Sequence, residues 1–213
     1  MIQKEKIKIA NVVVQRFQTN YPNPKTELTH ENEYQLAVAV MLSAQTTDKK
    51  VNQITPELFK KYPSWQSLAL SNYEDLEKTI HGVNFHKGKA KRLIEAGKLV
   101  WQKFNSNLPK DMSKLLEIPG VARKSANVIL QELWNISEGV VVDTHVTRVS
   151  NRLGLTTHQD AKKIEKDLMS LIPKESYRNF SGACVLHGRY ICVARKPKCS
   201  QCFLKDICIS AQF

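Results

Sequence analysis

The stretch MSKLLEIPGVARKSANVILQELW, residues 112–134, predicts two helices joined by a tight turn. Pro119 ends the first helical pattern, and Gly120 permits a backbone conformation that other residues avoid. The pattern restarts at Ala122, so the amides of the second helix's first turn face out of the turn. Unpaired amides and the positive end of a helix dipole together favour a phosphate. The alternative is an ordinary helix-turn-helix corner, which any helical bundle contains.

Lys124 lies in the first turn of the second helix of this hairpin. The positive end of the dipole and the adjacent Arg123 both favour a neutral amine there. A neutral amine is a nucleophile that can form a Schiff base. Lys124 is therefore a catalytic candidate, while a phosphate contact or a solvated side chain is the simpler explanation.

Asp143 follows the apolar run of residues 140–142 and directly precedes a helix start at Thr144. The role of a helix N-cap would explain it fully. A carboxylate delivered by a buried connector can also support positive charge that develops on a sugar. The two roles are compatible, so Asp143 is a second catalytic candidate.

Four of the five cysteines follow the spacing C-x6-C-x2-C-x5-C, namely Cys192, Cys199, Cys202 and Cys208. Four thiolates complete one tetrahedral zinc site or hold one four-iron cluster. Zinc sites usually pair their ligands as two short hooks, and only Cys199 and Cys202 form one here, which favours iron–sulfur. Two disulfides are the alternative, but they require an oxidising compartment.

The composition indicates a soluble globular protein with a polyanionic partner. The 213 residues are 42% apolar, and 32 Lys+Arg against 20 Asp+Glu give a net charge of +12. This charge favours nucleic acid, with basic clusters at 86–92 and 189–198, although solvated surfaces would also explain these runs. No apolar run approaches a membrane span, and the charged residues 1–8 do not resemble a signal peptide. We therefore expect a cytoplasmic, nucleoid-associated protein with no membrane partner.

Helical periodicity dominates the chain, and the predicted fold class is all-α. Residues 139–142 are the one extended run, which we interpret as a buried connector. The first predicted helix has one apolar face, and the others cover 34–42, 46–59, two short segments from Ser64 and Ser71, 87–104, 159–171 and 176–189. The residues on the face of the first helix are Ile7, Val12, Val13 and Phe17.

Three segments together resemble the endonuclease III family, the iron–sulfur branch of the helix-hairpin-helix DNA glycosylases. They are IPGVARKSANV (118–128), VDTHVTRV (142–149) and the four-cysteine tail. LSAQTTD (42–48) and LHGRY (186–190) match as well, in the family's order and across nearly the whole chain.

The resemblance implies two helical domains with a DNA-binding cleft between them. Residues 26–137 would form a six-helix barrel that contains the helix-hairpin-helix at 112–134, and residues 1–25 with 138–213 would form a [4Fe-4S] cluster domain. It also implies a bifunctional DNA glycosylase and AP lyase of base excision repair. Such an enzyme acts, as a monomer, on double-stranded DNA that carries a damaged pyrimidine or an abasic site.

The family's functional residues map onto this chain by motif. Lys124 matches the nucleophile that displaces an oxidised pyrimidine and then allows β-elimination, and Asp143 matches the carboxylate that assists base loss. The target nucleotide must leave the stack; Gln45 matches the residue that fills the vacated space, and Val83 lies near the intercalating residue. The four cysteines match the cluster ligands. The remaining expected DNA contacts are Gly120, Ala122, Arg123, His145, Arg195, Lys196 and Lys198.

Two departures from the family pattern affect these expectations. Ala122 stands where the hairpin usually has a second glycine, at a cost of about 1–2 kcal/mol if that position needs a positive φ. The loop at 82–90 is longer than usual, so either Val83 or Phe85 is the candidate for the intercalating residue.

Three other hypotheses compete with this interpretation. A mismatch-type glycosylase with weak lyase activity shares the cluster but lacks a lysine at the position of Lys124. A non-catalytic iron–sulfur protein that binds DNA and senses redox state would need neither Lys124 nor Asp143. A zinc-ribbon regulator would be colourless, whereas an iron–sulfur protein is yellow-brown.

Overall fold

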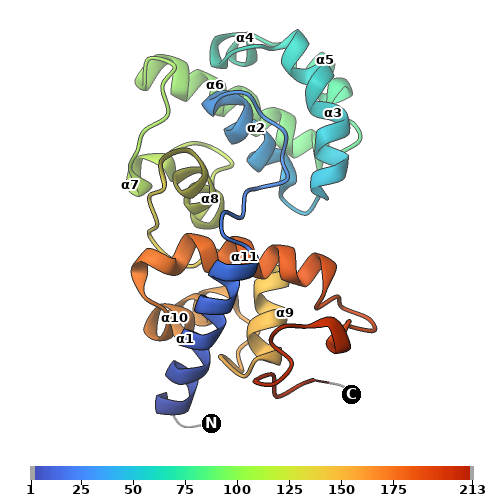
Figure 1. The fold of residues 1–213 in the computed structure, drawn as a ribbon. Coiled ribbons are helices and arrows are strands. Elements are labelled where there is room, and N and C mark those ends of the chain that lie inside the picture. The colour runs from blue at the N-terminus through green and yellow to red at the C-terminus, as the bar shows by residue number, and fades with distance from the viewer. Residues whose placement is uncertain (1–2, 212–213) are drawn as a thin grey trace. The chain divides into compact units, whose positions relative to one another are not determined.

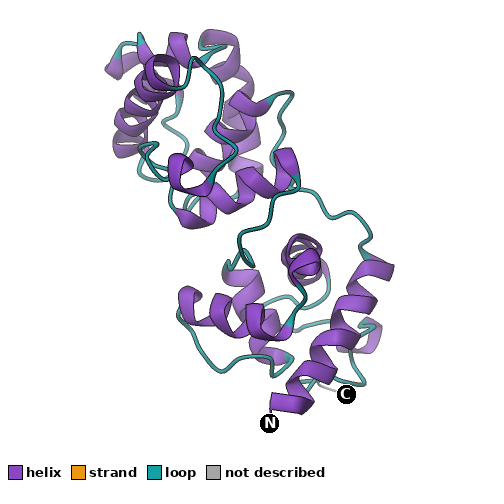
Figure 2. Ribbon diagram, turned by 90° about the vertical axis from the view of Figure 1, so that its left-hand side faces the viewer, coloured by secondary structure: helices purple, strands orange, loops and turns teal. Residues whose placement is uncertain are grey.

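The computed structural model describes residues 3–211, and every regular element in this range is helical (Figure 1, Figure 2). The predicted all-α class is confirmed. No helix within this range combines the length and the apolar character needed to cross a bilayer. In chain order the elements are α1 (Gln3–Asn20), α2 (Glu33–Ser43), α3 (Asp48–Lys61), α4 (Trp65–Ala69), α5 (Tyr73–Thr79), α6 (His86–Lys103), α7 (Met112–Leu115), α8 (Arg123–Trp134), α9 (Thr144–Arg152), α10 (Ala161–Leu171), η1 (Lys174–Ser176), α11 (Tyr177–Tyr190) and η2 (Cys199–Gln201).

The chain divides into two compact units, each with its own hydrophobic core. We call Glu27–Ile136 the continuous unit, because it is a single stretch of chain. We call Met1–Thr26 together with Ser137–Phe213 the discontinuous unit, because its two parts are separated in sequence.

Helix α2 is the centre of the continuous unit. It is apolar on every side, and its residues from Leu36 to Leu42 are all buried, as expected for a helix surrounded by others. Asn32 caps its N-terminus, where the side chain accepts from Gln35 N at 2.9 Å. Around α2 lie α3 to α6 and α8, with α7 as a single turn. Gly97 allows α4 to approach α6 closely, because a Cβ there would lie 2.8 Å from a backbone atom of Ala69.

The discontinuous unit joins α1 to α9, α10 and α11. The buried face of α1 is formed by Ala10, Val13, Val14 and Phe17, at i, i+3, i+4 and i+7. The predicted face was wrong for Ile7, which is 39% exposed, and for Val12, which is only partly buried and lies outside the core. At 3.6 residues per turn, Val12 lies on the opposite side of α1 from Ala10, and Ile7 lies at the edge of the buried face.

Residues 139–142 form no strand and are a buried connector, as predicted. Val140, Val141 and Val142 are all at most 9% exposed. The backbone amide of Val141 donates to Ser181 Oγ at 3.0 Å, which ties the connector to α11. This buried segment therefore leads directly into Asp143 and the start of α9.

Candidate active site and iron–sulfur centre

The turn of the hairpin lies between α7 and α8. Ile118 and Val121 are buried on either side of it, and Gly120 has φ +86°, a conformation that favours glycine. Ala122 has φ −91° and ψ 168°, which is ordinary extended backbone. A second glycine is therefore unnecessary at this position, and the alanine carries no conformational cost.

Lys124 is the second residue of α8, and its side chain is exposed. The N-cap of this helix, Ala122, has no side chain able to accept from the first-turn amides, so no side chain caps α8. The helix start therefore keeps its attraction for an anion such as a phosphate. Arg123, the first residue of the helix, is exposed beside it.

We predict that Gly120→Ala destabilises the protein by about 1–2 kcal/mol, because alanine tolerates a positive φ poorly. The new Cβ would also lie 3.0 Å from Met41 Cε and 3.4 Å from Arg92 Cβ. Gly88→Ala, in α6, is the matched control: nothing lies within 4 Å of its Cβ position. We expect this control to stabilise the protein by a few tenths to about 1 kcal/mol. Urea unfolding measures both changes, and equal effects of the two variants would contradict the argument.

Asp143 is the N-cap of α9, in the discontinuous unit. The backbone amides of His145 and Val146 both donate to the same oxygen, Oδ1, at 2.8 Å each. Within residues 3–211, Oδ2 accepts no hydrogen bond. Capping therefore occupies one carboxylate oxygen and leaves the second available for chemistry.

His145 follows Asp143 by two residues and is half-buried against α11. Its ring lies so close to Gly188 that any side chain there would clash. Arg148 Nη2 lies 3.2 Å from His145 Nδ1. Burial lowers the pKa of His145, and Asp143 opposes that shift. The net downward shift of this pKa favours the neutral ring next to the carboxylate.

Gln45 lies in a strained loop between α2 and α3, with φ +55°. Asn84, from the loop before α6, donates its side-chain amide to Gln45 O and its backbone amide to Thr46 Oγ1 at 3.1 Å. The two loops in which we expected DNA contacts therefore hold each other in place.

Lys89 is a residue that the sequence analysis did not single out. It is only 6% exposed, and its ammonium donates to Leu42 O at 2.7 Å, Ala44 O at 2.7 Å and Thr46 Oγ1 at 3.1 Å. These acceptors lie at the end of α2 and in the loop that follows. Lys89 thus fixes the backbone that presents Gln45.

We predict that Lys89 makes stability depend on pH. Burial lowers the pKa of Lys89 from 10.5 to about 8, so between these values the unfolded chain binds one more proton than the folded chain. Below about pH 8 the folded protein bears the whole free-energy cost of burying the charged ammonium of Lys89. As the pH rises towards 10.5 the buried amine is neutral, and this cost falls. Relative to Lys89→Met, the wild type should therefore gain unfolding free energy over this window, by at most roughly 3 kcal/mol.

Chemical denaturation across this pH range measures the gain, with Lys91→Met as the control. Lys91 lies on the same helix but is exposed, so its variant should follow the wild type in parallel. Parallel curves for the wild type and Lys89→Met would contradict the shifted pKa of Lys89.

The structure corrects the expectation for Val83. This side chain is 2% exposed and belongs to the core of the continuous unit, so it offers no surface to DNA. Phe85, two residues later, is 66% exposed and has φ +58°. Of the two candidates for the intercalating residue, only Phe85 is accessible.

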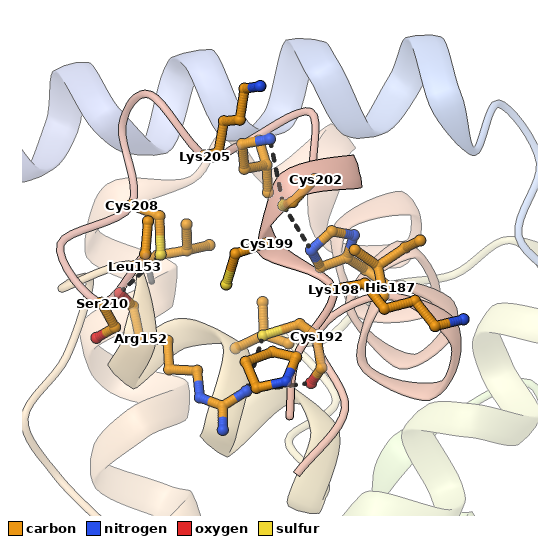
Figure 3. Close-up of a pocket in the computed structure, with 15 residues that line it drawn as sticks. Arg152, Leu153, His187, Cys192, Lys198, Cys199, Cys202, Lys205, Cys208 and Ser210 are labelled. Atoms are coloured by element: carbon orange, nitrogen blue, oxygen red, sulfur yellow. Dashed lines mark hydrogen bonds between the residues drawn. The ribbon is translucent and has the colours of Figure 1, made fainter. Parts of the chain in front are cut away.

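The four cysteines of the tail line one pocket in the discontinuous unit (Figure 3). No three of their sulfurs lie within 4.8 Å of one another. A tetrahedral zinc ion about 2.3 Å from each sulfur would need sulfurs about 3.8 Å apart. The arrangement therefore fits a larger cluster better than a single zinc ion. A cluster bound here would cross-link the four cysteines and so fix residues 192–208.

Two of these sulfurs accept hydrogen bonds from the protein. Arg152 Nη1 donates to Cys192 Sγ at 3.2 Å, and the amide of Leu204 donates to Cys202 Sγ at 3.4 Å. Such donors stabilise thiolate charge and tune the potential of a bound cluster. His187 Nε2 lies 3.5 Å from Cys202 Sγ, and burial lowers the pKa of His187 to about 4. Cys184, the fifth cysteine, is fully buried and lies outside the pocket lining.

Helix α9 connects this pocket to Asp143. Arg148 Nε donates to Cys192 O at 3.0 Å, and Arg152 donates to Val193 O at 2.9 Å and to Ala194 O at 3.0 Å. Helix α9, which is capped by Asp143, thus fixes by hydrogen bonds the loop that carries Cys192. Beyond that loop the three expected phosphate contacts, Arg195, Lys196 and Lys198, are all exposed.

The predicted residues therefore fall into two groups. The continuous unit brings together the hairpin residues Gly120, Ala122, Arg123 and Lys124, and it also holds Gln45. The discontinuous unit holds Asp143, His145, the four cysteines and the basic residues of the tail.

Two family comparisons match the chain. The HhH-GPD superfamily of base excision DNA repair proteins matches residues 38–174, and the iron–sulfur binding domain of endonuclease III matches residues 192–208. The second match begins at Cys192 and ends at Cys208. It confirms the expected [4Fe-4S] cofactor in place of zinc or disulfides.

Relatives of known identity agree. Endonuclease III of Synechocystis sp. is 46% identical over 192 residues, which cover 90% of this chain and 88% of that protein. Endonuclease III of Bacillus subtilis is 36% identical over 193 residues, with coverage of 90% and 88%.

Solved structures extend this agreement to the fold. A non-covalent endonuclease III–DNA complex matches with a TM-score of 0.89 and 34% identity, over 99% of this chain and 97% of that chain. A trapped covalent endonuclease III–DNA intermediate matches with the same TM-score and identity, over 99% and 98%. A thermostable thymine-DNA glycosylase, 20% identical with a TM-score of 0.81, shares the fold. Together these matches show that the chain belongs to the endonuclease III family, within the HhH-GPD superfamily of base excision DNA repair proteins.

Proposed function

We propose that this protein removes oxidised pyrimidines from double-stranded DNA and then cuts the strand, with Lys124 as nucleophile and Asp143 as its carboxylate partner. Family membership makes the chain a DNA glycosylase and AP lyase of base excision repair. The observation that carries the residue assignment is an exposed lysine in the first turn of an uncapped helix, directly after the hairpin turn.

The chemistry proceeds in two stages. The neutral amine of Lys124 attacks C1′ of the sugar, the C1′–N bond breaks, and the base leaves with the bonding electrons and a proton. The amine and the opened sugar then form an imine, loss of a proton from C2′ expels the 3′ phosphate, and water releases the lysine. The carboxylate of Asp143 offsets the positive charge that develops on the sugar during base loss.

Two features support the assignment of Asp143. Its Oδ1 is occupied by the amides of α9, which orient the group, and its Oδ2 accepts no hydrogen bond within residues 3–211. Endonuclease III has also been solved as a trapped covalent intermediate with DNA, so covalent attachment occurs in a relative of the same fold.

Borohydride trapping on a panel of duplexes tests the proposed substrate class. Duplexes carry thymine glycol, dihydrouracil, an abasic site, or a normal thymine in a mismatch. We expect covalent adducts with the first three and none with the mismatch. Adducts with mismatched thymine alone would instead support a mismatch-type enzyme, and no adduct at all would support a non-catalytic DNA-binding protein.

We further infer that one copy of the protein engages one lesion, that Phe85 enters the stack, and that Arg195, Lys196 and Lys198 contact phosphates. The net charge of +12 would keep the protein on the nucleoid. Phe85→Ala should then weaken binding to lesion duplexes more than binding to single strands, because a single strand has no stack to open.

Salt dependence tests the phosphate contacts. We predict that Arg195→Gln reduces the slope of log Kd against log salt by about 1, since one phosphate contact is lost. Lys166→Gln in α10, an equally exposed cation outside the cysteine tail, should leave the slope unchanged. Equal slopes for Arg195→Gln and the wild type would remove Arg195 from the DNA-binding surface.

A further inference from the structure

Three potential metal ligands converge at the end of the continuous unit that holds the loop of Phe85. They are Glu77 on α5, His81 in the following turn, and His86 at the start of α6. One ligand atom from each lies within 4.8 Å of the other two. His86 Nε2 is 3.1 Å from Glu77 Oε1, and the two imidazole rings have centroids 4.5 Å apart.

An ion pair between Glu77 and His86 would explain only two of the three residues. His81 adds a second imidazole to this pair, and within residues 3–211 its side chain forms no hydrogen bond or ion pair. Two imidazoles that face one carboxylate gain little from each other without a shared ion. A cation held by all three accounts for the whole arrangement.

The frame that presents these ligands is well packed. Ile80 is fully buried and Val83 is 2% exposed, so the turn that carries His81 is anchored in the core on both sides. The side chains of Glu77 and His86 are only 24% and 22% exposed. Ligands at 2.0–2.1 Å from one ion lie about 3.3 Å apart. Glu77 and His86 already lie at about this separation, and a rotation of the His81 side chain would bring its nitrogen to the same spacing.

The donor set selects the kind of metal. Two imidazole nitrogens and one carboxylate oxygen suit Zn²⁺ and the neighbouring divalent transition metals, whereas Mg²⁺ and Ca²⁺ prefer oxygen ligands alone. Three protein ligands leave one tetrahedral position for water.

We propose that Glu77, His81 and His86 form a second metal site, which binds Zn²⁺ or a similar transition-metal ion and clamps the loop between α5 and α6. The ion would close a short loop that contains Asn84, which holds Gln45 and Thr46, and the exposed Phe85. Binding therefore rigidifies the segment that we expect to enter the DNA stack. The site itself does not depend on which base the enzyme removes.

Equilibrium dialysis of the cluster-loaded protein against low-micromolar ZnCl₂ tests the site, with zinc and iron counted in the same sample. We expect one zinc per chain above the metal of the cluster, with no loss of iron. His81→Ala should weaken this binding at least about tenfold. His81 is exposed and has no other role in the packing, so this variant should fold normally.

His158→Ala is the matched control, because His158 lies 3.9 Å from Asp167 as a histidine–carboxylate pair without a third ligand. It should bind zinc as the wild type does. Hydrogen exchange provides a second readout: zinc should slow the amides of residues 80–86 in the wild type and not in His81→Ala. The site is overturned if the wild type takes up no zinc, if zinc uptake is accompanied by loss of iron, or if His81→Ala binds zinc as the wild type does. The clamp is overturned if zinc leaves the hydrogen exchange of residues 80–86 in the wild type unchanged.

Discussion

Lys124→Ala is expected to abolish strand cutting and borohydride trapping, with a loss of about 10⁴-fold or more in the rate of adduct formation. The reason is that no other amine can take its place at the start of α8, where the hairpin turn presents the second residue of the helix. The measurement is single-turnover trapping on an abasic-site duplex, which separates the covalent step from base removal.

Lys162→Ala provides the control for this change. Lys162 is also the second residue of a helix, α10, and is likewise exposed, so the substitution has the same local effect on stability. It should trap at the wild-type rate. Adducts that persist in Lys124→Ala and disappear in another lysine variant would reassign the nucleophile.

Asp143→Asn is expected to slow base excision by roughly 10²- to 10⁴-fold while leaving the fold intact. The amide oxygen of asparagine can still accept from the amides of His145 and Val146, which now bond to Oδ1. In the proposed mechanism, what is lost is the negative charge that offsets the positive charge developing on the sugar. Cutting of a preformed abasic site should suffer less, because no base has to leave. The measurement is release of dihydrouracil under single-turnover conditions.

Asp160→Asn makes the same chemical change at an equivalent position, the N-cap of α10, where the side chain accepts from Lys163 N. Both variants should unfold within about 0.5 kcal/mol of the wild type, since asparagine is as good an N-cap as aspartate. Equal losses of activity in the two variants, or a large loss of stability in Asp143→Asn alone, would reduce Asp143 to a structural cap.

Local signals predicted much of the fold. The predicted starts of two helices, at residue 46 and at Ser64, agree with the structure, where Thr47 and Ser64 are the N-caps. The hairpin turn was also local, because a proline, a glycine and two apolar flanks lie within a few residues. The pattern Pro119-Gly120 needs no distant contact to be interpreted, and its glycine has the positive φ that justifies it.

Other features depend on contacts between residues far apart in sequence. Lys89 stood in a run of basic residues that suggested a solvated face, yet its ammonium binds the end of α2, more than forty residues earlier. Val83 and Phe85 are both apolar, and only the packing of the continuous unit shows that one is buried and the other exposed. A sequence pattern shows neither the contact of Lys89 with α2 nor the burial of Val83 and exposure of Phe85, so neither feature was predictable.

The discontinuous unit also determines an order of events during synthesis. α1 leaves the ribosome first, but α9, α10 and α11, against which its buried face packs, are made after the whole of Glu27–Ile136. At ordinary rates of translation this delay is about 5–20 seconds, during which Phe17 and its apolar neighbours remain in water or in contact with a chaperone. The set of cluster ligands is complete only once the last of the four cysteines, Cys208, has emerged. The nascent enzyme therefore has a finished hairpin well before it has a finished cofactor centre.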